Sequence, residues 1–176
     1  MSILVSGGAG YIGSHTCVEL LNEGYDVVIM DNLYNANIKA VERIEQITGK
    51  KVTFYQTDML DREGVKAIFD NEKIDAVIHF AGLKAVGESV VKPIEYYTNN
   101  MSGTLILCDE MRNHGVKNII FSSSATVYGS PAEIPITENC PKGTATNPYG
   151  WTKWMLEQVL TDIHTADPEW NVILLR

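Results

Sequence analysis

The chain has 176 residues, of which 45% are hydrophobic, and its formal net charge at pH 7 is -8. This length and composition predict one compact domain over residues 1–176, and they exclude disordered, collagen-like and low-complexity classes. The acidic balance argues against a nucleic-acid partner, because the average field repels a polyanion. No apolar run reaches the roughly 20 residues of a membrane span, so no membrane association is expected.

The N-terminal segment indicates the compartment, and the cysteines indicate neither disulfides nor a metal site. Residues 1–6 lack the basic region and cleavage site of a signal peptide and lead directly into glycines, which predicts a first strand and a cytoplasmic protein. The cysteines and histidines show neither disulfide nor metal-ligand spacing, so no metal site is expected. We expect Cys17 and Cys108 to be buried thiols, because both lie in apolar helical patterns.

Strand-like and helix-like segments alternate along the chain. Short runs rich in β-branched residues predict six strands, at 2–6, 26–30, 52–56, 76–80, 117–122 and 171–175. Helical spacing predicts helices at 11–23, 38–48, 61–71, 94–114 and 149–165, with Asp61 as an N-cap. Residues 82–92 are expected to form a loop, and 130–147 a surface excursion near the site. This alternation predicts an α/β fold, a doubly wound parallel sheet of six strands with helices on both faces.

A glycine-rich turn separates the first predicted strand from the first predicted helix. Gly7, Gly10 and Gly13 form a G-x-x-G-x-x-G pattern, which is a weak signal alone but lies here in the required context. Glycines allow the backbone to approach a pyrophosphate closely. The helix N-terminus adds free N–H groups and a partial positive charge, so an acidic protein can still bind a dianion.

Two acidic residues follow the next strands. Asp31 ends the second strand, where a carboxylate accepts hydrogen bonds from both hydroxyls of an adenosine ribose. The same charge repels a 2′-phosphate, which favours NAD over NADP as the cofactor. Asp58 ends the third strand and is placed to contact the adenine amino group, although an aspartate that caps a turn is a fair alternative.

Tyr149 and Lys153 form a Y-x-x-x-K pattern at the start of a predicted helix. Positions i and i+4 share one helical face, so a phenol and an ammonium group can lie side by side. A free tyrosine has a pKa of about 10, and a nearby cation lowers it toward that of a usable base. Chance pairs at this spacing are common on helices, so the pattern gains weight only from other site residues.

Two segments that leave the strands supply such residues. Ser124, with Ala125 and Thr126, follows the fifth strand at the end where ligands bind in open α/β sheets. Its hydroxyl could bond a substrate hydroxyl and relay the proton to Tyr149, whereas a plain serine-rich turn is the alternative. After the fourth strand, residues 80–84 suit backbone close to a cofactor. Lys84 either contacts a ribose or phosphate or is an ordinary solvated lysine. Asn99 either faces the cofactor or is an ordinary polar helix residue.

These motifs resemble one known family over the whole chain. GGAGYIGSHT from Gly7, DNL from Asp31, HFAGLK from His79, SSSATVYG from Ser122 and YGWTK from Tyr149 are similar to the extended short-chain dehydrogenase/reductases, and within them to the nucleotide-sugar 4-epimerases. The predicted catalytic residues are Tyr149 as base, Lys153 as its partner and Ser124 as the contact to the substrate hydroxyl. The predicted substrate set is Lys84, Ser124, Ala125, Thr126 and Tyr149. The predicted cofactor set is Gly7, Gly10, Tyr11, Ile12, Gly13, Asp31, Asn32, Leu33, Asn35, Asp58, Met59, Phe80, Ala81, Gly82, Lys84, Asn99, Ser122, Tyr149 and Lys153.

The resemblance implies an NAD-dependent interconversion of UDP-glucose and UDP-galactose through a 4-keto sugar. Related 4,6-dehydratases carry an acidic pair after the strand-five threonine, and residues 124–126 lack it, which disfavours dehydration. Another nucleotide-sugar enzyme of the superfamily, a decarboxylase or a reductase, stays open, as does a non-catalytic NAD-binding module. Family members are about twice as long, so a C-terminal substrate domain is expected to be absent here, and the full-length form is expected to be a homodimer.

Overall fold

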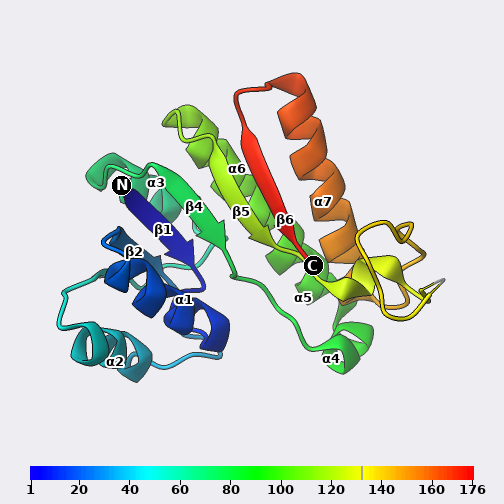
Figure 1. Ribbon diagram of the computed structural model, residues 1–176, viewed down its shortest axis with the longest axis horizontal. Helices are drawn as coiled ribbons and strands as arrows, with labels where there is room; N and C mark the ends of the chain where they lie inside the picture. Colours follow the sequence, from blue (N-terminus) through cyan, green and yellow to red (C-terminus); the bar gives the residue numbers. More distant parts are fainter. Residues whose placement is uncertain (132) are drawn as a thin grey trace.

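The computed structural model describes residues 1–131 and 133–176, and within them one six-stranded sheet (Figure 1). The strands lie in the order β3-β2-β1-β4-β5-β6, and every neighbouring pair is parallel. Their bounds are β1 (Ser2–Ser6), β2 (Asp26–Met30), β3 (Thr53–Tyr55), β4 (Ala76–His79), β5 (Asn118–Ser122) and β6 (Asn171–Leu175). The order reverses between β1 and β4, which is the doubly wound arrangement, so the predicted fold class is confirmed.

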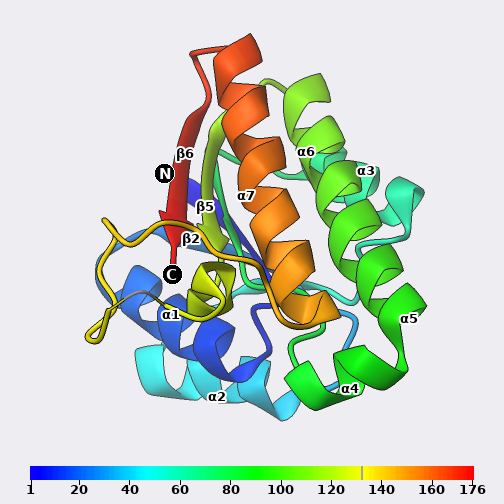
Figure 2. The ribbon, with the colours of Figure 1, turned by 90° about the vertical axis from the view of Figure 1, so that its right-hand side faces the viewer.

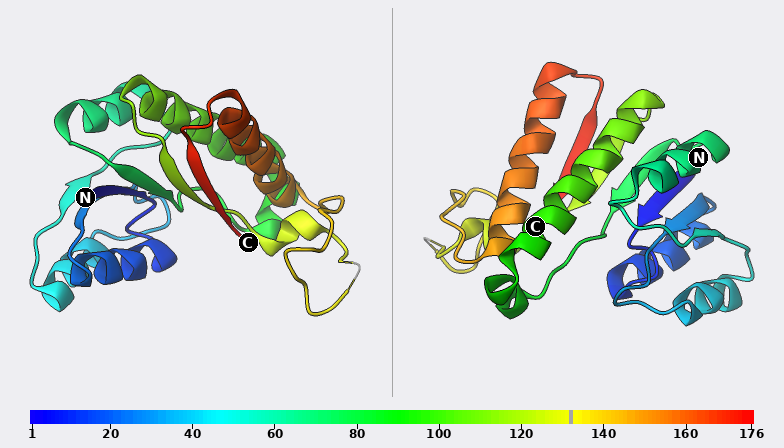
Figure 3. Two further views of the ribbon diagram at one scale, coloured as in Figure 1. Left: turned by 45° about the horizontal axis from the view of Figure 1, so that its top comes forward. Right: turned by 180° about the vertical axis from the view of Figure 1, so that it is seen from behind.

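Helices cover both faces of the sheet. Their bounds are α1 (Tyr11–Asn22), α2 (Lys39–Thr48), α3 (Arg62–Asn71), α4 (Val86–Val91), α5 (Pro93–Tyr97), α6 (Gly103–Asn113) and α7 (Pro148–Ala166). Figure 2 shows α6 and α7 side by side over one face, and Figure 3 shows α1 and α2 beyond the other. Asp61 accepts a hydrogen bond from the backbone N–H of Gly64 at 3.1 Å, which confirms the predicted N-cap of α3.

Alternation along the strands divides the core into two layers. In β1, Leu4 faces the layer that contains α3, α6 and α7, whereas Ile3 and Val5 face the layer that contains α1 and α2. Cys17 packs in the second layer and Cys108 in the first, so both predicted buried thiols are confirmed. Burial on both faces explains why the strands read as continuous apolar runs.

The predicted loop at 82–92 contains a helix, so this prediction was wrong. The segment Val86–Val91 forms α4, whose six residues are too few to show a helical period in the sequence. Side-chain contacts, not a pattern within the segment, hold this helix in place. The buried Tyr96 hydroxyl accepts a hydrogen bond from Ala85 N at 3.0 Å and donates one to Glu88 at 2.9 Å, which holds α4 against α5.

The long helix predicted at 94–114 is divided into three parts. Between α5 and α6, the segment Thr98–Ser102 is a π-helix, here labelled η1. Close packing accompanies the change, because a Cβ on Gly103 would lie 2.8 Å from the Met59 Cε atom. The start of α6 therefore packs tightly against Met59 in the segment after β3, and an alanine at 103 would displace the flexible end of that side chain. π-Turns inside helices are frequent at functional sites, which directs attention to this place.

The excursion between β5 and α7 has no regular helix or strand from residue 130 to 147, Ala132 excepted, as predicted. Before it, a 3₁₀ helix labelled η2 (Ala125–Tyr128) follows β5, and the sequence analysis did not predict it. Asn147 then caps α7 by accepting a hydrogen bond from Gly150 N at 2.8 Å, and Pro148 occupies the first helical position.

β6 is one of the two edge strands of the sheet, and one of its faces is open. Ile173 and Leu175 are 52% and 47% exposed, whereas their neighbours Val172 and Leu174 pack against the layer beneath α7. Among the described residues, no helix combines the length and apolar character needed to cross a bilayer.

His114 joins α6 to α3 and should make stability depend on pH. Its ring contacts Asp70 Oδ1 at 3.0 Å and the Glu110 carbonyl at 2.8 Å, and the hydrogen bond to Asp70, followed by that carbonyl, raises its pKa. A raised pKa stabilises the fold fully below the unfolded value of about 6.5, and the contribution is lost as pH rises through the folded value. The urea concentration at the unfolding midpoint should therefore decrease as the pH is raised from 6 to 8.

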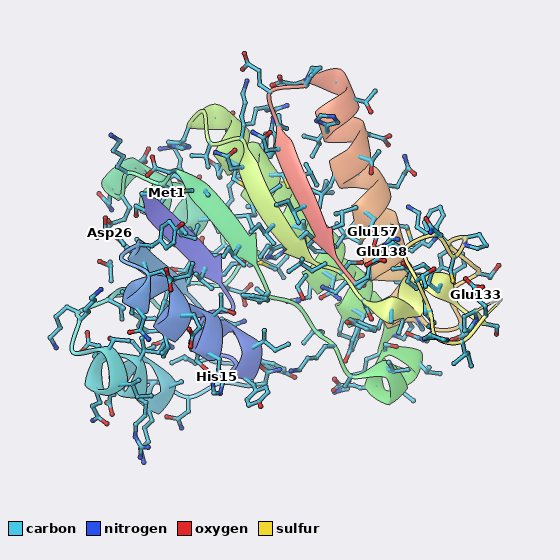
Figure 4. All side chains as sticks on the ribbon, in the orientation of Figure 1. Met1, His15, Asp26, Glu133, Glu138 and Glu157 are labelled. Carbon is cyan, nitrogen blue, oxygen red and sulfur yellow. The ribbon has the colours of Figure 1, made fainter. Side chains whose placement is uncertain are left out.

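The matched variants are His114→Gln and His15→Gln. His114→Gln should flatten this pH dependence, whereas His15, exposed on α1 and labelled in Figure 4, lies away from α3 and α6 and should leave it unchanged. An equal slope in the wild type and His114→Gln would show that another group is responsible.

Candidate active site

A cavity of about 640 Å³ lies at the carboxyl ends of the parallel strands. The segments that follow β1, β2, β3, β4 and β5 all contribute to it, together with the first turns of α1 and α7 and part of η1. Ligands bind at this edge of doubly wound sheets, at the point where the strand order reverses. The volume suits a small organic molecule.

The glycine turn forms the floor of the cavity beside β1. Gly7 has φ +74°, a conformation that favours glycine, and donates a hydrogen bond to the Met30 carbonyl at 2.7 Å. A Cβ on Gly7 would lie 2.6 Å from Ala81 N, so only glycine allows these two segments to meet. Gly10 and Tyr11 then begin α1, whose N-terminus faces the cavity with free N–H groups.

Asp31 lies 9% exposed in the cavity wall and is held by the backbone on both sides. One carboxylate oxygen accepts a hydrogen bond from Ala9 N at 3.1 Å and the other from Leu33 N at 2.9 Å. Leu33 has φ +59°, which is uncommon for a branched side chain. These bonds fix the carboxylate before any ligand arrives and leave lone pairs free for further donors.

Asp58 is joined to the segment after β2. Its Oδ2 accepts a hydrogen bond from Asn32 Nδ2 at 2.7 Å, and its Oδ1 accepts one from Leu60 N at 2.8 Å. Asn32 and Asp58 line the cavity next to Asn35. Asp58 therefore forms the local turn that was the alternative prediction and also faces the cavity, so the two interpretations are compatible.

The segment after β4 forms the opposite wall. Phe80, Ala81, Gly82 and Lys84 line the cavity, as does Asn99 of η1. The neighbouring side chain of η1 holds this wall: the buried Asn100 amide accepts a hydrogen bond from Leu83 N at 2.8 Å and donates one to the Leu83 carbonyl at 2.9 Å. The π-helical turn thus directs one asparagine to the cavity and the next into the core.

Tyr149 and Lys153 enter the same cavity from the first turns of α7. Lys153 is 5% exposed, its Nζ donates a hydrogen bond to the Ser122 carbonyl at 2.7 Å, and it lies 5.9 Å from the centre of the Tyr149 ring. Burial lowers the pKa of Lys153 to about 8, so most of the ammonium stays charged at pH 7. A phenol beside a buried cation is suited to proton transfer.

Ser124 lies outside the cavity lining, unlike its neighbours Ser122 and Ser123. Its hydroxyl is the N-cap of η2, because it accepts hydrogen bonds from Thr126 N at 3.2 Å and from Thr126 Oγ1 at 3.0 Å. The structure thus shows the capping turn that was the alternative interpretation. The roles proposed for Ser124, Ala125 and Thr126 toward substrate stay predictions.

Most of the predicted site residues line one cavity. Of the predicted sets, those absent from the lining are Leu33, Ser124, Ala125 and Thr126. Leu33 instead fixes Asp31 through its backbone. The structure adds lining residues that the sequence analysis did not single out: Met30, Tyr34, Thr57, Leu60, Leu83, Ile94, Glu95, Thr98 and Ser123. Most of them neighbour a predicted residue in the chain, whereas Ile94 and Glu95 are brought in by α5. No described residue from 130 to 147 lines the cavity.

The profile of the family described as NAD dependent epimerase/dehydratase matches residues 3–176. The chain belongs to this family. A curated relative, the UDP-glucose 4-epimerase of Bacillus subtilis, is 65% identical over 176 residues, which are 100% of this chain and 52% of the relative. The chain therefore spans about half the length of the curated relatives it matches.

Solved structures of family members have the same fold. The crystal structure of UDP-glucose 4-epimerase from Bifidobacterium longum in complex with NAD+ and UDP is 58% identical, with a TM-score of 0.99, and the match covers 100% of this chain and 52% of that one. The enzyme from Stenotrophomonas maltophila, with bound NAD and formylated UDP-arabinopyranose, is 46% identical, with a TM-score of 0.96, and the match covers 100% and 52%.

Proposed function

We propose that this chain is the cofactor-binding part of an NAD-dependent 4-epimerase that interconverts UDP-glucose and UDP-galactose through a 4-keto sugar. The observation that carries the proposal is the meeting of four features in one cavity: the glycine turn, Asp31, Tyr149 and Lys153. A purely non-catalytic binding module would not need the last two. The 65% identity to an epimerase that covers the whole chain supports the same activity.

The residues present fit NAD. The close backbone approach at Gly7 and the free N–H groups of α1 suit a pyrophosphate. The prepositioned carboxylate of Asp31 suits the two hydroxyls of an adenosine ribose. Asn32 and Asp58 suit the adenine, and Lys153 suits the nicotinamide ribose. When bound, the cofactor supplies a hydride acceptor that later returns the hydride to the sugar.

The chain's own chemistry is proton transfer and orientation. Tyr149 is the proposed base that removes the proton of the sugar 4-hydroxyl and returns it after the sugar has turned over. Lys153 stabilises the phenolate by its charge, from its fixed bond to the Ser122 carbonyl. Ser124 is the proposed contact to the same hydroxyl, which requires it to exchange its bond to Thr126 for one to substrate.

The remaining partners are proposed on the same basis. We propose that residues 1–176 form an NAD-binding domain, with Lys84 and residues 124–126 facing a UDP-sugar. Homodimer formation would use the faces of α5, α6 and α7, where Leu105 is an exposed apolar residue outside the cavity lining. A cytoplasmic location is supported by three cysteines that are all unpaired thiols.

Asp31→Ala is expected to weaken NAD binding by about tenfold to a hundredfold, because hydrogen bonds to a charged group contribute about 1.5–3 kcal/mol. Isothermal titration of NAD into the 176-residue chain measures the loss. Asp26→Ala is the matched control, since Asp26 is exposed at the other end of the same strand, as Figure 4 shows. Unchanged affinity in Asp31→Ala would remove this carboxylate from the ribose.

A coupled assay of UDP-galactose conversion to UDP-glucose tests the whole proposal. It is run on the 176-residue chain and on the longest protein that carries it, with NAD added and bound nucleotide measured in parallel. Turnover supports the epimerase. NAD binding without turnover in either form would favour a non-catalytic module, and the absence of both would contradict the proposed site.

A further inference from the structure

A buried carboxylate on α7 connects three segments beside the cavity. Glu157 follows Tyr149 and Lys153 at intervals of four residues, so the three side chains share one face of the helix. Its side chain is 0% exposed. Figure 4 labels Glu157 on α7, close to the end of β6. A fully buried carboxylate is costly unless its hydrogen-bonding and charge needs are met.

The contacts of Glu157 meet these needs. Its Oε1 accepts a hydrogen bond from Ser123 Oγ at 2.5 Å and from Arg176 Nε at 2.9 Å. Its Oε2 accepts one from Arg176 Nη2 at 2.8 Å and lies 3.5 Å from Lys142 Nζ. Burial raises the pKa of Glu157, but the hydrogen bonds from Arg176 and Ser123 lower it by more, so the group stays ionised.

These contacts secure both ends of one segment. Ser123 lies at its start, immediately before Ser124. At its end, the Tyr128 hydroxyl accepts a hydrogen bond from Arg176 Nη1 at 2.9 Å, and Arg176 is itself held by Glu157. Between the two anchors lie the residues proposed to face the sugar, 124–126. A single carboxylate therefore fixes this segment to the helix that carries Tyr149.

We propose that Glu157 is a positioning residue for the reaction: through Ser123 and Arg176 it holds residues 123–128 at a fixed place relative to Tyr149. The inference rests on the proposed function for its catalytic consequence. Glu157 does not line the cavity, whereas its partner Ser123 does, so it acts on the reacting residues through Ser123 and Arg176. Misplacing a reacting group by about 1 Å can reduce the rate about a hundredfold.

The test compares Glu157→Gln, Ser123→Ala and a matched control. Glu157→Gln keeps the shape of the side chain but loses its charge. Ser123→Ala removes one anchor only and covers the case in which the first variant does not fold. Glu110→Gln is the control, because Glu110 is also a buried glutamate with an arginine partner, Arg62 at 2.9 Å, but lies in α6 away from the cavity.

Two readouts are measured. The first is hydrogen exchange in the 176-residue chain, at the amides of Thr126, Val127 and Gly129, which are bonded within the segment. Exchange there should become at least tenfold faster in Glu157→Gln and Ser123→Ala but not in Glu110→Gln. The second is steady-state epimerisation in the longest protein that carries this chain. There kcat should fall tenfold or more in Glu157→Gln, which lies outside the cavity lining, while the Kd of NAD for this variant stays within twofold.

Unchanged exchange in both variants overturns the inference whatever the activity, because the segment would then be held by other contacts. A loss of NAD affinity parallel to the loss of kcat, or an equal loss in Glu110→Gln, shows a general structural role and also overturns it. A wild-type protein without turnover contradicts the proposed function alone, and exchange still tests the positioning.

Discussion

Tyr149→Phe is expected to reduce turnover by about 10²–10⁴-fold while NAD binding stays close to that of the wild type, because the change removes a proton-transferring group and little else. The phenol ring keeps its packing at the start of α7, where Tyr149 is buried and lines the cavity. The measurement is the steady-state rate in the longest protein that carries this chain, with NAD affinity determined by titration on the same samples.

The control for Tyr149→Phe is Tyr25→Phe, which removes a phenolic hydroxyl just before β2, at the opposite edge of the sheet. This variant should keep the full rate. A near-normal rate in Tyr149→Phe would show that another group takes the proton. Equal losses of rate and of NAD affinity would mean instead that the hydroxyl contributes to cofactor binding.

Gly7→Ala should reduce NAD affinity more than tenfold, which corresponds to about 1.4 kcal/mol or more. An added Cβ would lie 2.6 Å from Ala81 N and 2.8 Å from Ala81 Cα, and neither backbone atom can move without shifting the wall after β4. The turn and the wall would separate, although both must contact one ligand. Titration of NAD measures the loss of affinity, and the urea midpoint measures any loss of stability.

Gly115→Ala separates steric conflict from backbone strain. Gly115 has φ +71°, close to the +74° of Gly7, but a Cβ there would meet nothing within 4 Å. Placing a side chain in this left-handed region costs about 1–2 kcal/mol, so the control should lose stability without losing NAD affinity. If both variants lowered NAD affinity equally, unfolding rather than the cavity geometry would be the cause.

Local sequence signals were sufficient for the elements that carry their own pattern. The β-branched strands, the glycine turn and the Asp61 cap depend on residues close together in the chain, and all were predicted. Asp31 lines the cavity because parallel strands end on a common side of the sheet, and Tyr149 joins it there from the first turn of α7.

The elements that were missed depend on contacts distant in sequence. α4 is too short to show a period and is held by the Tyr96 hydroxyl. The 3₁₀ helix η2 was not predicted, and its last residue is held by the distant Arg176 through the Tyr128 hydroxyl. The role of Glu157 depends on Ser123 and Arg176, which lie 34 and 19 residues away. No spacing rule relates such positions.

The π-helical segment η1 constrains the length of the chain at this point. A π-turn holds about one residue more than the 3.6 residues of an α-helical turn. The wider turn lets the consecutive Asn99 and Asn100 both point inward, the first into the cavity and the second to Leu83. Deleting one residue from 98–102 would restore a regular helix and remove one of these two inward positions. Substitutions in η1 can therefore be tolerated where deletions cannot, and natural length variation among relatives should fall outside it.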